Sequence, residues 1–210
     1  MTDPRDPFCS QFNTPENREA VDCCRLDDVK TRRAGVLAAV AETSYQIAMV
    51  FTGGGTGMIG HCFARPGASK NFLEGTVPYA RDSVADYLGT NQEVSAASAA
   101  AAEQLAARAF ERASRFAGHE TQPVGLALVA ALPTAPPRRG QDRVHVTLHT
   151  EKVCRTWSIE LPAGQHTRES AESVAEELVL LAFSRLIGCD ATGSTRFLSG
   201  EGLNVVEVAS

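Results

Sequence analysis

The sequence predicts an α/β domain of three layers, α/β/α, built on a mixed sheet. Apolar runs typical of buried strands alternate along the chain with helix-like segments. The run 124–131, VGLALVAA, is apolar throughout, as expected of a strand that is covered on both faces. The segments 143–150 and 153–161 alternate with a period of two residues, which indicates a hairpin and adds antiparallel strands to the sheet.

Local signals set the bounds of the expected elements. Asp27 and Asp28 stand in the first turn of a helix, and Pro66 stops a later, short helix. Gly89 is a C-terminal helix signal, and Thr167 is the expected N-cap of a long helix. The alanine-rich stretch before Gly118 has the strongest helix propensity in the chain. Helices are expected at 26–41, 56–64, 80–88, 95–118 and 167–187, and strands at 46–51, 72–79, 124–131, 143–150 and 153–161.

These elements make one domain, at 26–188. Residues 1–25 are expected to be an irregular leader. Residues 189–210 are expected to be a Gly/Ser-rich linker that ends in a strand-like stretch, LNVVEV. There is no internal repeat and no sign of a second domain.

Composition narrows the class of protein. Apolar residues make up 43% of the chain and charged residues 21%, with a net charge of −5, which is typical of soluble globular proteins and argues against nucleic-acid binding. Glycines and polar residues break the longest uncharged stretch, 43–60, so no membrane span is predicted. The N-terminus lacks the features of a signal peptide, and a cytoplasmic location is expected. Six cysteines, Cys9, Cys23 and Cys24 among them, form no CxxC pair; we expect reduced thiols and no metal.

A glycine cluster follows the first expected strand. Gly55-x-Gly57-x-x-Gly60 has the spacing of a dinucleotide-binding turn, as in Rossmann-type NAD(P)-dependent oxidoreductases and epimerases. Two supporting features of that class are weak or absent. Pro66 cuts the following helix short, and no tyrosine is followed by lysine four residues later. Glu74 stands at about the distance expected of a ribose-binding acid, although it lies within a strand-like segment.

Beyond the glycines, several motifs occur in a recognisable order. TGGGTG is followed by PGASKNFLEGTVPYARDSVADYLG, the alanine-rich helix, GLALVAALPTAPPRRGQDRVHVTL, and a helix with Arg168 near its start. Over residues 26–188 this order resembles the C-terminal domain of the competence/damage-inducible protein CinA family, which also occurs alone as nicotinamide-nucleotide (NMN) amidohydrolase. The resemblance implies a C–N amide hydrolase if the chain is active, and a tendency to form homo-oligomers.

The chain departs from that family at both catalytic positions. Family deamidases attack with a serine in the glycine motif, and a lysine five residues after the motif tyrosine supports it. Gly54 stands at the serine position and Val84 at the lysine position. Because hydrolysis needs an attacking oxygen and a proton acceptor, a catalytically degenerate protein is expected, and the catalytic residues are not identified. Replacement hydroxyls are offered by Ser69, Ser83, Thr52 and Thr56, with His61 nearby in sequence.

A ligand site is the remaining functional hypothesis. Consecutive glycines can present backbone N–H groups to an anion, and arginines can bracket a phosphate. The candidate residues for binding a small nucleotide or phosphate are Thr52, Gly53, Gly54, Gly55, Thr56, Gly57, Tyr79, Arg81, Arg138 and Arg143, with Arg139 flanking the same loop. No cofactor is expected. The glycines could instead serve only a tight turn beside a neighbouring strand, and the domain could be a structural oligomerisation module.

Overall fold

The computed structural model describes residues 28–89, 97–137 and 140–209. A six-stranded sheet runs through the molecule in the order β2-β1-β3-β4-β5-β6. Its strands are β1 (Tyr45–Thr52), β2 (Phe72–Thr76), β3 (Gln122–Ala131), β4 (Asp142–His149), β5 (Cys154–Leu161) and β6 (Val206–Ala209). β2, β1 and β3 pair in parallel, whereas β4, β5 and β6 add antiparallel strands, which confirms the predicted mixed sheet.

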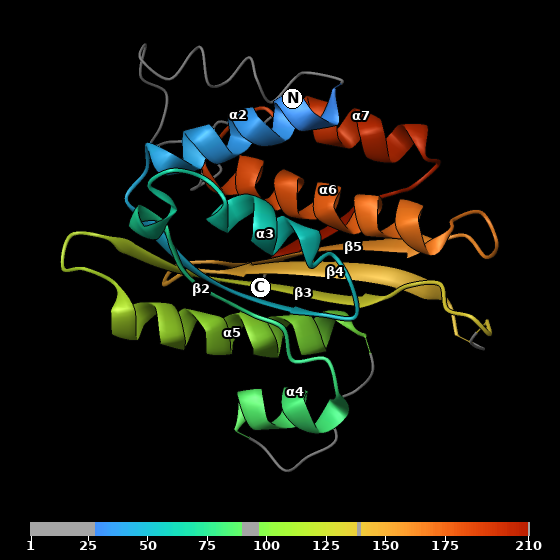
Figure 1. Ribbon diagram of the computed structural model, residues 1–210, viewed down its shortest axis with the longest axis horizontal. Helices are drawn as coiled ribbons and strands as arrows, with labels where there is room; N and C mark the ends of the chain where they lie inside the picture. The colour runs from blue at the N-terminus through green and yellow to red at the C-terminus, as the bar shows by residue number, and fades with distance from the viewer. Residues whose placement is uncertain (1–27, 90–96, 138–139, 210) are drawn as a thin grey trace.

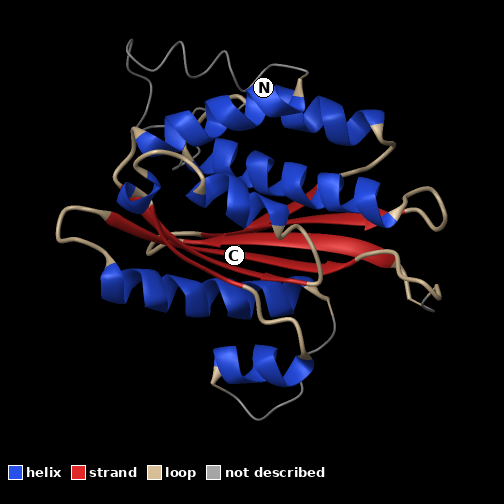
Figure 2. Cartoon of the chain, in the orientation of Figure 1, coloured by secondary structure: helices blue, strands red, loops and turns tan. Residues whose placement is uncertain are grey.

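Helices cover both faces of the sheet (Figure 1). The helices are α2 (Val29–Ala41), α3 (Gly57–Phe63), α4 (Arg81–Leu88), α5 (Ala99–Phe116), α6 (Arg168–Leu186) and α7 (Thr192–Gly200), with a short 3-10 turn, η2 (Ala68–Lys70). One face carries α6, with α2, α3 and α7 around it, and the other carries α5, with α4 outside it (Figure 2). This is the predicted three-layer α/β/α arrangement.

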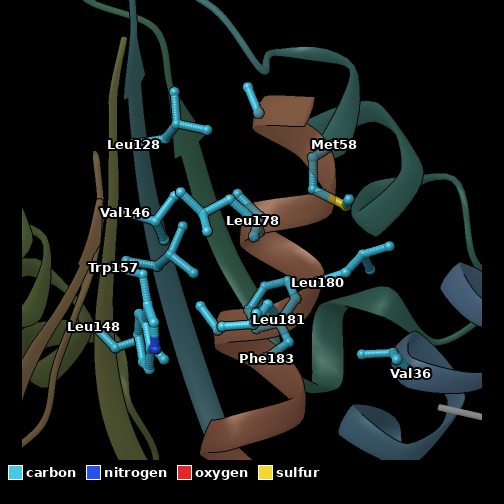
Figure 3. Close-up of a cluster of buried hydrophobic side chains, with 14 of the residues drawn as sticks. Val36, Met58, Leu128, Val146, Leu148, Trp157, Leu178, Leu180, Leu181 and Phe183 are labelled. Carbon is cyan, nitrogen blue, oxygen red and sulfur yellow. The ribbon is translucent and has the colours of Figure 1, made fainter. Parts of the chain in front are cut away.

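The alternation of side chains along each strand divides the core into two clusters. On β1, Ile47, Met49 and Phe51 belong to the cluster beneath α6, whereas Ala48 and Val50 belong to the cluster beneath α5. The α6 side contains the large side chains, and Figure 3 shows residues of strands and helices meeting there, with Trp157 opposite α6. The α5 side is built mainly from alanine and valine, so α5 can approach the sheet closely.

The closest approach of α5 to the sheet occurs at Gly125 in β3. A Cβ atom at this position would clash with the main chain of α5 at Ala106 and Phe110. Ala102, Ala106 and Ala109 are fully buried on the facing side of the helix. The alanine-rich composition therefore serves packing as well as helix propensity.

A buried ion pair joins α2 to α6. Both guanidinium nitrogens Nε and Nη2 of Arg32 donate to the carboxylate of Glu177, each at 2.8 Å. The two side chains are 0% and 1% exposed. The Arg32 guanidinium also lies 5.9 Å from the ring centroid of Phe197 on α7. The pair thus connects the elements of the outer helical layer through a site closed to water.

Two expectations about the chain are wrong. The tail is not a linker, because α7 forms at Thr192–Gly200. Asp190 accepts from the backbone N–H of Thr192 at 2.9 Å, at the beginning of the helix. Leu198 is fully buried, so one face of the helix packs against the domain. The second strand ends at Thr76 rather than at 79. The strand-like end of the tail is confirmed as β6, and the leader 1–25 lies outside the described residues.

Among the described helices, none combines the length and apolar character needed to cross a membrane.

We expect Glu177→Ala to destabilise the protein by about 3–5 kcal/mol, because it leaves a buried guanidinium without its carboxylate. Chemical denaturation measures the change in the free energy of unfolding. The control is Glu111→Ala, whose partner Arg108 lies on the surface of α5, and which should cost less than about 1 kcal/mol. A comparable small effect for both variants would contradict the structural importance of the buried pair.

We expect Gly125→Ala to destabilise the protein by about 1–3 kcal/mol or more, because the added methyl group overpacks the interface of β3 and α5. Gly60→Ala is the matched comparison, since a Cβ atom there meets no atom within 4 Å. In the interior of a helix that change should be neutral or stabilising by up to about 1 kcal/mol. The same unfolding measurement distinguishes the two, and equal effects would refute the close approach of α5.

Candidate functional site

The glycine turn lies where the strand order of the parallel sheet reverses. From β1 the chain passes through the turn and α3 to β2 on one side, and later returns to β3 on the other side of β1. In open α/β sheets, ligands bind at the carboxyl ends of strands at such a switch point. The turn that follows Thr52 is therefore correctly placed for a ligand site.

Packing against β3 requires glycine in this turn. Gly53 and Gly55 have positive φ values of 84° and 68°, which side chains rarely tolerate. A Cβ atom at Gly53 would clash with the carbonyl oxygen of Ala130, and one at Gly55 would meet the side chain of Leu128. The glycines are thus explained by the neighbouring strand, as one of the two sequence hypotheses held, whether or not a ligand binds.

A carboxylate from α6 occupies the open side of the turn. The backbone N–H of Gly55 donates to Oε2 of Glu172. The other carboxylate oxygen of Glu172 accepts from Arg168, at 2.9 Å from Nε and 2.7 Å from Nη2. Arg168 also donates to the carbonyl oxygen of Gly53 at 3.1 Å. Glu172 and Arg168 therefore connect the two ends of the glycine turn to the first turns of α6.

Tyr79 joins this group through Arg168. Burial alone would lower the pKa of Arg168, but interactions with the Glu172 carboxylate and the Tyr79 hydroxyl outweigh it, and the pKa is raised overall. Tyr79 itself is 65% exposed. Tyr79 and the glycine turn thus both interact with Arg168.

A second carboxylate, Glu176, lies one turn further along α6. It lies over Gly57, where a Cβ atom would clash with Oε1. Burial raises the pKa of Glu176, and Arg33, whose Nη1 lies 3.4 Å from Oε2, opposes the rise. His61 Nε2 lies 3.8 Å from the same oxygen, and burial and then Arg33 lower the pKa of His61, which disfavours its charged form. Glu176 thus lies between Arg33 and His61.

Other predicted site residues lie apart from this group. Arg143 is on the α5 side of the sheet, where its Nε donates to the carbonyl oxygen of Ala97. Arg81 begins α4 and is exposed, and Thr56 is exposed at the start of α3. Thr52 ends β1, half-buried. Arg138 and Arg139 lie outside the described residues.

Position 54, where the nucleophile was expected, has no side chain, and neighbouring residues take most of the space that a side chain would need. A Cβ atom on Gly54 would clash with Cδ1 of Leu132 and would lie 3.3 Å from Oε2 of Glu172. Val84, at the lysine position, is packed in the apolar cluster beneath α5. Of the replacement hydroxyls, Ser69 and Ser83 are exposed on η2 and α4. Within the described ranges, no group of three or more His, Cys, Asp or Glu residues could hold a metal ion.

Glu172 and Glu176 were missed by sequence reasoning, which described the last long helix only by its N-cap, Thr167, and by Arg168 near its start. The signal that pointed to Glu172 is its spacing of four residues from Arg168, which places both side chains on one helix face. Only the fold shows that this face meets the glycine turn.

Solved structures with a similar fold belong to the CinA superfamily. A CinA superfamily protein from Escherichia coli matches with a TM-score of 0.60 at 16% identity, covering 77% of this chain and 90% of that one. One from Klebsiella pneumoniae matches with a TM-score of 0.56 at 12% identity, covering 80% and 97%. A competence/damage inducible protein from Agrobacterium tumefaciens matches at 0.53 and 19% identity, covering 74% and 91%. No family model and no curated protein matches the sequence. These likenesses confirm the predicted CinA-like fold.

We expect Gly54→Ser to destabilise the protein by about 1–3 kcal/mol, because its side chain must displace Leu132 from a buried position. Leu132→Ala alone should also destabilise, by about 2–5 kcal/mol. The double variant should cost clearly less than the sum, since the cavity accepts the serine. A double-mutant cycle by denaturation measures this coupling, and strict additivity would show that Leu132 does not fill the position.

Proposed function

Proceeding from the CinA-like fold, we propose that this protein is a catalytically degenerate relative of the nicotinamide-nucleotide amidohydrolases that uses its glycine turn to bind a nucleotide or phosphate ligand. The observation that carries the proposal is the state of position 54. No side chain stands there, and the space that one would need is taken by Leu132 and approached by Glu172.

The loss of amide hydrolysis follows from the chemistry of the site. A serine-type deamidase needs an attacking hydroxyl and a neighbouring group that takes its proton. Gly54 supplies no hydroxyl. Val84, on α4, is only 9% exposed in an apolar cluster, where a lysine would bury an ammonium group at a high cost in free energy.

The capacity to bind an anion is supported by the turn itself. The N–H of Gly55 already holds a carboxylate oxygen, and the Arg168 guanidinium donates to the same carboxylate. A backbone N–H at a turn and an arginine fork are groups that recognise phosphates. Their position at the switch point of the sheet is where a nucleotide would be expected.

The dinucleotide-binding alternative has less support. α3, which follows the turn, is only seven residues long. Glu74, the candidate ribose-binding acid, is paired instead with Arg112 of α5, whose Nη2 lies 2.7 Å from Oε2. The acid therefore faces the α5 side, whereas the glycine turn meets α6.

We expect no release of ammonia from NMN above the rate in buffer, measured with a coupled ammonia assay at high protein concentration. A serine-bearing deamidase of the same fold is the positive control. Steady turnover that exceeds the amount of protein would overturn the proposed loss of catalysis.

Isothermal titration calorimetry of the wild-type protein with NMN, NAD, NADP and inorganic phosphate tests the ligand. We expect saturable, weak binding of NMN or phosphate. Binding of NAD or NADP without NMN would favour the oxidoreductase hypothesis. No binding of any of them, together with an oligomer that resists dilution in light scattering, would favour a structural oligomerisation module.

A further inference from the structure

A single side chain, Glu172, occupies two of the candidate anion-binding groups at the glycine turn. Glu172 accepts from the N–H of Gly55 with one oxygen and from Arg168 with the other. Nη2 of Arg168 also donates to the carbonyl oxygen of Gly53. The N–H of Gly55 and the guanidinium of Arg168 are therefore already engaged within the chain.

We propose that Glu172 is an internal anion that must be displaced before a phosphate-bearing ligand can bind at the glycine turn. In the bound state the phosphate oxygens take over the N–H of Gly55 and the guanidinium of Arg168, and the carboxylate turns outward. The proposal rests on the proposed ligand-binding function and adds its regulation. When no ligand is bound, the carboxylate of Glu172 occupies the site.

The absence of a side chain at position 54 is what admits the carboxylate. A Cβ atom there would lie 3.3 Å from Oε2 of Glu172, tighter than ordinary van der Waals contact. The carboxylate would have to shift by a few tenths of an ångström to accommodate that atom. Glycine at position 54 therefore lets Glu172 reach the turn without this shift.

The exposure of the group makes displacement feasible. Glu172 is 30% and Arg168 42% exposed, and they form an i,i+4 pair on the surface of α6. Such pairs contribute little to stability, because water screens and replaces them. The buried pair of Arg32 and Glu177, by contrast, is shut off from solvent. Glu172 can thus leave the turn without loss of the fold when a phosphate oxygen takes over the N–H of Gly55, and a dianionic phosphate competes for these donors with a higher charge.

The test compares inorganic phosphate binding by wild type, Glu172→Ala and Glu172→Gln, with calorimetry or ³¹P NMR at constant ionic strength. We expect phosphate to bind Glu172→Ala about tenfold more tightly or better, because charge-assisted hydrogen bonds to the competitor are gone. Glu172→Gln keeps the size and one acceptor but loses the charge, so its affinity should lie between the two. Circular dichroism and thermal melts establish that each variant is folded.

Two matched variants identify the cause of the gain. Glu169→Ala removes the same charge from the first turn of α6 at an exposed position, and it should leave phosphate affinity within about twofold of wild type, as expected of a screened surface charge. Arg168→Ala in the Glu172→Ala background should abolish the gain, because the phosphate then loses its cationic partner. An equal gain in phosphate affinity in Glu169→Ala would show that the effect comes from net charge alone, and it would overturn the proposal.

Wild-type binding separates this proposal from the proposed function. If wild type binds NMN or phosphate and neither Glu172 variant binds phosphate more tightly, Glu172 is not a competitor, although the ligand site stands. If wild type binds none of the ligands and Glu172→Ala binds phosphate, the internal anion is confirmed and the ligand-binding function of the natural protein is overturned. If no protein binds phosphate or NMN, both proposals fail.

Discussion

The helices on the α6 side of the sheet depend on the contacts that the carboxylates of α6 make with other segments. Glu177 points into the helical layer and pairs with Arg32 of α2, closed to solvent. Glu172 reaches the glycine turn after β1, and Glu176 lies over Gly57 between them. One helix thereby fixes the position of α2 and shapes the loop at the switch point of the sheet. The three acids of α6 thus face three different partners: the N–H of Gly55, the backbone at Gly57, and Arg32.

The glycine turn combines a CinA-like framework with a position that leaves little room for a side chain. The sheet, the turn at the carboxyl end of β1 and an arginine near the start of α6 are all in place. The proposed loss of catalysis concerns two positions, because Gly54 has no hydroxyl and Val84 packs in an apolar cluster. A serine at position 54 would also require the side chain of Leu132 to shift.

Sequence reasoning succeeded where the signal is local or periodic and failed where it is long-range. The hairpin strands were predicted from their period of two residues, the strand at 124–131 from its continuous apolar run, and the alanine-rich helix from its helix propensity. α7 was missed because its sequence, TGSTRFLSG, has little helix propensity. It buries Gly193, Ser194 and Leu198 against the rest of the domain, a tertiary contribution that the local sequence does not signal. Arg143 was assigned to the site from its place after the second loop, but the pleat of β4 turns it to the other face.

By itself the sequence determined the class of fold, the order of its elements as far as α6, the turn after β1 and the absence of a side chain at Gly54. Residue type and periodicity contain that information, because backbone conformation and the pattern of burial depend largely on residues that are close in sequence. Only the tertiary structure decided what fills the turn. Glu172 is distant from Gly55 in sequence and has no local reason to contact it. The contact exists because the sheet sets the start of α6 beside the end of β1, where an exposed carboxylate finds an N–H that no strand partner satisfies.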